Sequence, residues 1–180
     1  ETGIRAAEVS TATAYVNALK AVEYVFTDGY DRNLGETFGV KVGSLSDMKT
    51  FEDFYAAVLA EWSHLIELSI RISSSYEPYL SYINPSNMYS ATIETALNKG
   101  LDAYQNGVKF NNSALLNCGF ASLVDSVMAV KKFVYDKKEV SLEEMKAALD
   151  NNWNGYEALH AKVLNSIHKY GCHDDETDVY

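Results

Sequence analysis

GVKFNNSALLNCGFASLVDSVMAVKKFV, residues 107–134, is the stretch that decides how the chain folds. Two glycines flank a short, partly apolar segment that a polar run interrupts at residues 111–113. This pattern predicts one or two short strands with a tight polar bend. From Phe120 to Val134 apolar residues recur every three or four positions, as they do on one face of a helix. The stretch therefore predicts strand structure that leads directly into a strong helix.

Helical patterns predominate on both sides of this stretch. Thr50 with Asp53 and Ser141 with Glu144 are capping signals, each placed just before an apolar run of helical period. The predicted helices cover residues 15–28, 50–72, 91–99, 120–134, 141–151 and 156–167. Glycine-rich and proline-containing segments at 30–49 and 73–87 predict loops. The expected fold class is therefore mostly α with a few short strands.

The composition predicts one globular segment and excludes several partners. The chain has 180 residues, of which 47% are hydrophobic and 22% charged, and its formal net charge is −10. Such an acidic chain is a poor nucleic-acid partner, because phosphate binding needs clustered Lys and Arg. No apolar run approaches the roughly 18 residues of a membrane span, and no secretory signal pattern opens the sequence. We therefore expect a cytoplasmic protein with no membrane segment.

The two cysteines and the late histidines carry no strong signal. Cys118 and Cys172 form no CxxC pair, so a reduced cytoplasmic protein is expected. Cys118, directly before a predicted helix, could be an activated thiol, but a buried structural cysteine is favoured. A His and Asp group at 168 and 173–175 has no metal-ligand spacing, and the acidic residues there are typical of a solvated tail.

Two E-x-x-H units raise the alternative of a di-iron carboxylate helical bundle. This class of site uses two such units together with two further glutamates. The candidate ligands are Glu61, His64, Glu157, His160, Glu23 and Glu94. On a helical wheel, however, Glu61 falls roughly 90° from its apolar stripe, His64 lies nearly opposite that stripe, and Glu157 falls about 100° from the next one. We therefore expect no metal, and the di-iron bundle stays an alternative.

Several segments together resemble the pyruvate formate-lyase-like family of glycyl radical enzymes. Residues 106–112 are similar to the family's Gly-Gly-Ala-Lys-Tyr-Asn-Asn segment, and 119–134 to its following turn and helix. The early run at 17–23 is similar to the family's Asn-Leu-Ala-Lys-Ala-Leu-Glu helix. Near the end, 152–157 and 169–171 also match, whereas Cys172 and His173 depart from the family pattern. The resemblance spans essentially all 180 residues.

The resemblance implies a radical enzyme of which this chain is an internal piece. Residues 1–180 would be the C-terminal half of a pyruvate formate-lyase-like domain, part of a ten-stranded α/β barrel, without the cysteine loop and the glycyl radical domain. The parent enzyme would be a lyase, a dehydratase or a formate acetyltransferase-like transferase of anaerobic metabolism. It would be a homodimer that takes a small-molecule substrate. A separate radical S-adenosylmethionine activase would install its glycyl radical, and this segment itself would bind no cofactor.

The same resemblance assigns roles to four residues. Glu1, in what looks like the tail of the cysteine loop, would be a general base, and favours the lyase, dehydratase and decarboxylase branches. Tyr15 would line the substrate pocket, although it could equally be a core residue of the first helix. Asn111 and Asn112 would approach the barrel interior as substrate-binding residues, although ordinary turn chemistry also explains them. Without the thiyl cysteine the chain would be inactive alone, and a non-catalytic structural or interaction domain remains the other alternative.

Overall fold

The computed structural model describes residues 9–166, 169–173, 175 and 177. These residues form two compact units. Unit 1 contains the described residues up to Val16 and Ile66–Leu116, and unit 2 contains Asn17–Leu65 and the described residues from Asn117 onward. The described part is mostly helical, as predicted, and none of its helices is long and apolar enough to cross a membrane.

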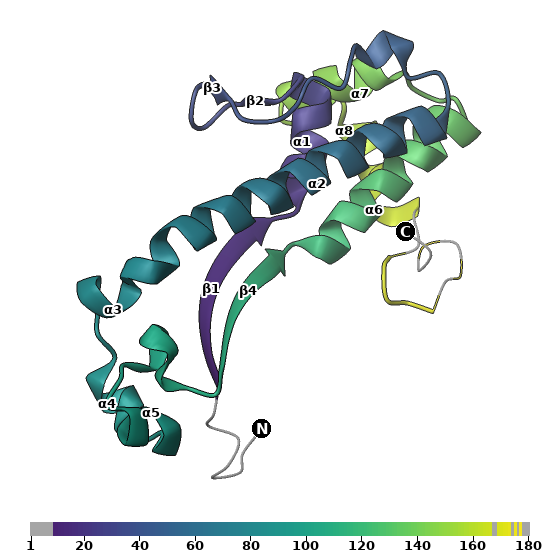
Figure 1. Cartoon of the computed structure of the whole chain (residues 1–180). Helices are drawn as coiled ribbons and strands as arrows, with labels where there is room; N and C mark the ends of the chain where they lie inside the picture. Colours follow the sequence, from purple (N-terminus) through teal and green to yellow (C-terminus); the bar gives the residue numbers. More distant parts are fainter. Residues whose placement is uncertain (1–8, 167–168, 174, 176, 178–180) are drawn as a thin grey trace. The chain divides into compact units, whose positions relative to one another are not determined.

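Strands β1 (Val9–Asn17) and β4 (Phe110–Cys118) form a two-stranded sheet. In Figure 1 the two arrows lie side by side and point the same way, so the pair is parallel. The pairing continues one step beyond β1, where the Ala18 amide donates to the carbonyl of Cys118 at 2.9 Å. The connection between the two strands contains several helices, as a parallel crossover requires.

The predicted polar bend at residues 111–113 is wrong. These residues lie within β4, which runs without interruption from Phe110 to Cys118. Pairing with β1 holds this segment extended, whereas a polar run without a partner strand tends to form a turn. Gly119, at φ 77°, then turns the chain into the next helix.

The predicted first helix begins later than its apolar pattern indicates. The helix α1 is Leu19–Thr27, whereas Tyr15 belongs to the strand β1. The Asn17 Oδ1 accepts a hydrogen bond from the amide of Leu19 at 3.1 Å, and so satisfies a free donor at the helix start. At the other end the predicted stop is confirmed, because the Gly29 amide donates to the carbonyl of Tyr24 at 2.8 Å.

Helix α2 (Phe51–Tyr76) begins at the predicted capping signal and continues past the predicted end. The Thr50 amide donates to Asp53 Oδ2 at 2.8 Å, and the Asp53 amide donates to Thr50 Oγ1 at 3.2 Å. Its apolar stripe enters the core of unit 2, where Phe54 is completely buried against the rings of Phe26 and Tyr135.

The remaining helices of unit 2 close the same core. They are α6 (Phe120–Val130), its π-helical continuation (Lys131–Asp136), α7 (Leu142–Asp150) and α8 (Glu157–Ser166). The predicted capping box opens α7, with Ser141 and Glu144 each bonding the other's backbone amide. Two short strands, β2 (Tyr30–Asp31) and β3 (Glu36–Thr37), form a small antiparallel hairpin, and a 3-10 turn covers Leu45–Asp47, so the segment predicted as one loop is partly ordered.

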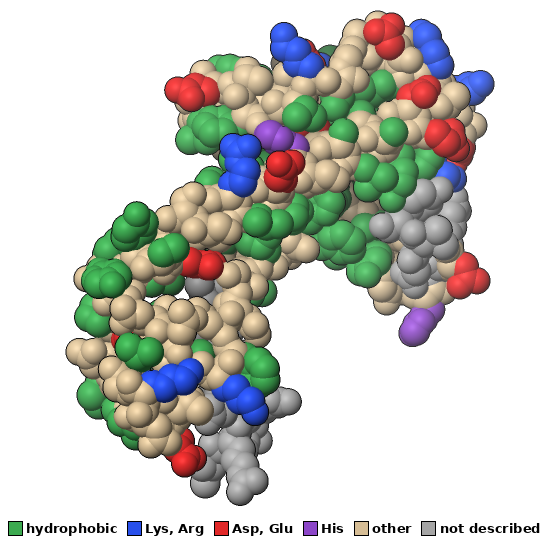
Figure 2. Space-filling model, in the orientation of Figure 1, with side chains coloured by type: hydrophobic (Ala, Val, Ile, Leu, Met, Phe, Trp, Pro, Cys, Tyr) green, Lys and Arg blue, Asp and Glu red, His purple; other side chains and the backbone are tan. Residues whose placement is uncertain are grey.

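Unit 1 contains short helices with a small core. Beyond α2 these are a 3-10 turn (Glu77–Tyr79), α3 (Leu80–Ile83), α4 (Asn87–Ser90), α5 (Glu94–Lys99) and a π turn (Ala103–Gly107). The core consists of Ile93, Ala96, Ala103 and Val108. Asp102 strengthens it by accepting hydrogen bonds from the Ser86 and Tyr104 amides. Large apolar side chains around these short helices stay exposed (Figure 2).

Candidate functional site

The sheet β1–β4 presents three of the predicted site residues to solvent. Tyr15 is 73% exposed on β1, whereas Val16, the next residue, is buried. Asn111 and Asn112 are both exposed on β4. The core-helix alternative for Tyr15 is therefore wrong, because Tyr15 lies on a strand and outside the core. The fourth predicted site residue, Glu1, lies outside the described residues.

Strand geometry separates the two asparagines. Successive side chains on a strand point to opposite faces, so Asn111 and Asn112 cannot both point to one face. The Ala18-to-Cys118 hydrogen bond fixes the register of this parallel pair, and counting back along both strands places Tyr15 beside Leu116. Residues 112, 114 and 116 share a face, so Asn112 lies on the Tyr15 face of the sheet and Asn111 on the other.

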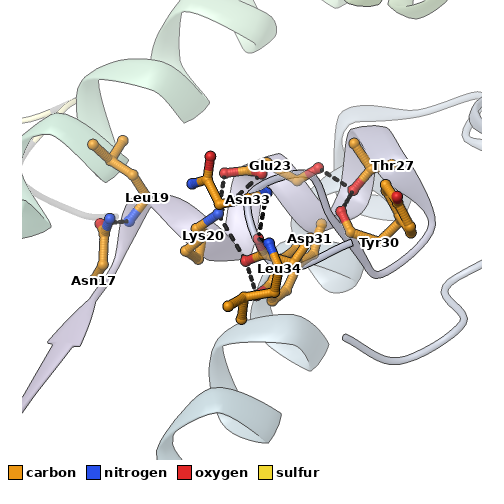
Figure 3. A network of polar contacts seen from close by, with 10 residues as sticks. Asn17, Leu19, Lys20, Glu23, Thr27, Tyr30, Asp31, Asn33 and Leu34 are labelled. Carbon is orange, nitrogen blue, oxygen red and sulfur yellow. Dashed lines mark hydrogen bonds and ion pairs between the residues drawn. The ribbon is translucent and has the colours of Figure 1, made fainter. Parts of the chain in front are cut away.

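A buried ionic network joins α1 to the β2–β3 hairpin in unit 2 (Figure 3). Asp31 Oδ2 accepts from Lys20 Nζ at 2.8 Å and from the Tyr24 hydroxyl at 2.8 Å. Its Oδ1 accepts from the amides of Asn33 and Leu34 at 2.8 and 3.0 Å. No sequence motif indicates this network, because its only local signal is an Asp ahead of a turn.

The network fixes the protonation states of its members. The hydrogen bond from Lys20, followed by those from the Leu34 amide and Tyr24, holds the pKa of Asp31 well below its usual range. Burial, reinforced by the hydrogen bond to Asp31, raises the pKa of Tyr24 above its ordinary value. Asp31 is thus a stable anion, and both of its carboxylate oxygens accept hydrogen bonds. The network therefore holds the β2–β3 hairpin against α1, and it has no spare group for proton transfer.

The residues of the predicted di-iron alternative do not come together. The described residues contain no group of three or more His, Cys, Asp or Glu able to hold a metal ion. His64 Nε2 bonds the carbonyl of Phe38 at 2.8 Å, Glu157 accepts from the Gly155 amide, and His160 stacks on Trp153. The di-iron interpretation is therefore wrong for the described part of the chain.

Glu61 differs from its sequence-based placement. The helical wheel puts it roughly 90° from the apolar stripe, but its exposed fraction is 0%. The reason is tertiary, because the chain around Gly39 and Val40 folds over this part of α2 and covers the carboxyl group. A helical wheel describes one helix in isolation and contains no information on a segment that packs across it.

Cys118 also differs from expectation. It was predicted to be a buried structural cysteine, but it is exposed at the end of β4. Cys172 is exposed as well, and neither thiol is in a disulfide.

An apolar pocket of about 460 Å³ lies in unit 2 among α1, α6, α7 and α8. Apolar side chains such as Phe26, Met145 and Trp153 line it, and an ion pair between Arg32 and Asp150 stands at its edge. Trp153 has a left-handed backbone (φ 64°), with its amide bonded to the carbonyl of Ala148 at 2.8 Å. No sequence motif indicates this pocket, since it is assembled from four separate helices.

Comparison with known proteins identifies the class to which this fold belongs. The profile of the family described as pyruvate formate lyase-like matches residues 1–180. The chain belongs to this family, and its homologues include glycyl radical enzymes. The resemblance described from the sequence is thereby confirmed.

Three relatives illustrate the match. Trans-4-hydroxy-L-proline dehydratase of Clostridioides difficile is 29% identical over 178 residues, covering 99% of this chain and 23% of the relative. Its substrate-bound crystal structure superposes with a TM-score of 0.85 at 26% identity, over 96% of this chain and 22% of that one. (2S)-3-sulfopropanediol dehydratase of Klebsiella oxytoca is 32% identical over 92% of this chain and 20% of the relative. A glycyl radical enzyme of Archaeoglobus fulgidus gives a TM-score of 0.76 at 30% identity, over 92% and 21%. The chain thus spans about a fifth of the length of these proteins.

Proposed function

We propose that this chain supplies part of the catalytic barrel of a glycyl radical dehydratase or lyase. The observation that supports this most directly is the match of the whole chain to the pyruvate formate lyase-like family, with dehydratases among the relatives. The parallel pair β1–β4, in which each strand leads directly into a helix, is the arrangement that neighbouring strands of an α/β barrel have. In this proposal the segment comes from the second half of the ten-stranded barrel.

The proposal gives the strand residues distinct roles. Tyr15 lines the substrate pocket, where its exposed ring and hydroxyl can contact a small polar substrate. Asn112, on the same face of the sheet, contacts the substrate through its amide, whereas Asn111 faces away and supports the barrel wall. Glu1 is the general base that takes a proton from a substrate hydroxyl, a step that a carboxylate with a raised pKa performs well at neutral pH.

The radical chemistry comes from outside this segment. In the proposed parent enzyme a glycyl radical abstracts hydrogen from a cysteine, and the resulting thiyl radical abstracts hydrogen from a substrate carbon. A radical S-adenosylmethionine activase forms the glycyl radical, and the parent is a homodimer of the cytoplasm. The segment by itself contributes pocket walls and a base, so we expect it to be inactive alone.

The test is a turnover assay with the full-length polypeptide, activated without oxygen by its activase. Candidate substrates are trans-4-hydroxy-L-proline, (2S)-3-sulfopropanediol, and pyruvate with coenzyme A. The proposal predicts loss of water or another leaving group from a hydroxylated substrate, and no formate from pyruvate. Formate production would instead assign a formate acetyltransferase. Absence of a radical and of turnover with every substrate would favour a non-catalytic structural role.

A further inference from the structure

Glu61 is a buried ionisable residue that has no role in the proposed catalysis. Its carboxyl group has an exposed fraction of 0%, on a helix whose other buried side chains at this level are apolar. Oε2 accepts one hydrogen bond, from the Val40 amide at 3.1 Å. Within the described part of the chain, Oε1 has no hydrogen-bond partner. A buried carboxylate anion normally receives several donors or a cation, because burial without them is costly.

The carboxyl group rests directly on the backbone of Gly39. A Cβ atom at this position would lie 2.6 and 2.8 Å from the two Glu61 oxygens and 2.6 Å from the Cα of Gly29. Only glycine fits at position 39, between Glu61 on α2 and the backbone of Gly29. The same tight contact leaves no space for a counter-ion beside Gly39. The amides of Phe38 and Gly39 both bond the carbonyl of Gly29 at 2.9 Å, so the segment closes on itself over α2.

Few charged groups face Glu61 from the elements packed around it. On α2 itself, His64 lies one turn away and favours the anion, while its Nε2 bonds the carbonyl of Phe38. At the end of α1, Asp28 disfavours the anion. Tyr24, on the same helix, also interacts with Glu61, but its hydroxyl is bonded to Asp31. Among the described residues, no basic side chain forms an ion pair with Glu61.

We propose that Glu61 is a proton-dependent latch that holds the segment 29–40 on α2. In its neutral form the carboxyl group fits against Gly39 and accepts from Val40 without a charge to solvate. When the proton is lost, the buried anion has one donor and no cation, so the segment opens and admits water to the carboxylate. Burial, which raises the pKa of Glu61 above its ordinary value, agrees with this assignment.

The direction of the pH effect follows from this shift. A carboxyl group with a raised folded-state pKa stabilises the closed segment below the ordinary value, and this stability is lost as the pH rises through the raised value. For each unit by which the pKa of Glu61 is higher in the closed segment than in the open one, loss of the proton makes opening about tenfold more favourable. The proposal concerns local opening of unit 2 and does not depend on the proposed radical activity.

Hydrogen exchange measured by mass spectrometry on the full-length polypeptide tests the latch. Peptides covering residues 29–43 are compared at about pH 4 and about pH 8, after correction for intrinsic exchange rates. In the wild type we expect more frequent opening at the higher pH, by about tenfold for each unit by which closure raises the pKa of Glu61. In Glu61→Gln, which keeps an acceptor for Val40 and cannot ionise, the opening should be independent of pH.

His64 provides the matched control, because its side chain also bonds this segment through the Phe38 carbonyl. His64→Gln keeps a donor for the Phe38 carbonyl and leaves Glu61 in place, so the wild-type pH dependence should persist. Should Glu61→Gln fail to fold, Gly39→Ala is the second variant, and it should open the segment at both pH values. The latch is contradicted if opening in the wild type does not change with pH, if Glu61→Gln retains the change, or if His64→Gln abolishes it.

Discussion

The two units of this chain differ in how completely they bury their apolar side chains. Unit 2 has a large core in which aromatic and aliphatic residues from α1, α2, α6 and α7 contact each other, and Phe54 and Phe133 have exposed fractions of 0%. Unit 1 has a core of four small or medium residues. Its short helices expose large apolar side chains, such as Tyr82 at 74% and Met88 at 85%.

This difference indicates where the stability of the chain resides. Burial of apolar surface is the main favourable contribution to folding, so unit 2 should carry most of the free energy of unfolding. Many exposed large apolar side chains, such as those of unit 1, are typical of a contact region. In the proposed parent enzyme, the remainder of the barrel would cover it. The following predictions compare the two units.

The largest effect is expected in the core of unit 2. Phe54→Ala removes a fully buried ring that contacts Phe26 and Tyr135, and should lower the free energy of unfolding by about 3–5 kcal/mol. Urea denaturation of the chain measures this change. Leu59→Ala, on the exposed side of the same helix, is the control and should change it by less than about 1 kcal/mol. Equal effects of the two variants would contradict the packing described for unit 2.

A smaller effect is expected in unit 1. Ile93→Ala removes the largest side chain of the small core and should cost about 2–3 kcal/mol. Because the units have separate cores, hydrogen exchange should increase in residues 80–108 and stay unchanged in α1 and α6. The exposed Leu97 gives the control variant Leu97→Ala, for which no change is expected. A loss of protection across both units would show that their cores act as one.

The ionic network of Asp31 should make unit 2 sensitive to acid. Since the pKa of Asp31 is lowered in the folded state, its contribution to stability is present above the ordinary carboxyl value and is lost as the pH falls toward the lowered one. Asp31→Asn should be less stable than the wild type at about pH 7, and its stability should fall less between about pH 5 and about pH 2. Denaturation curves across this range measure both differences. Parallel pH profiles in the two proteins would exclude the network as the cause.

The smallest effect is expected at the start of α7. Ser141→Ala removes one half of the capping box and should cost about 1 kcal/mol. Glu144→Gln retains a side-chain oxygen for the Ser141 amide and should cost much less. Thermal unfolding followed by circular dichroism compares the two variants, and a larger loss in Glu144→Gln would contradict the assigned geometry.

Local signals predicted the features that local contacts determine. Thr50 with Asp53 and Ser141 with Glu144 mark the starts of α2 and α7 because each pair bonds within four residues of the chain. Gly29 and Gly100 likewise mark helix ends through their own left-handed backbones. The family resemblance added the function class, which no single motif carried.

The errors occurred where a distant segment decides the structure. Tyr15 continues the apolar spacing of α1, but pairing with β4 holds it in a strand. Residues 111–113 have turn composition, and the same pairing keeps them extended. Glu61 is buried because the backbone around Gly39 packs over it. Each of these contacts joins segments far apart in the chain, so a single-sequence pattern cannot contain them.

The central claim is that the Tyr15 face of the β1–β4 sheet is a wall of the substrate pocket in a glycyl radical enzyme. The direct test compares wild type with Tyr15→Ala in the full-length polypeptide, measuring substrate turnover at equal glycyl radical content determined by electron paramagnetic resonance. We predict an unchanged radical signal and turnover reduced by at least about tenfold, which corresponds to about 1.4 kcal/mol of lost transition-state stabilisation. Unchanged turnover in the variant, or no radical signal in the activated wild type, would contradict the claim.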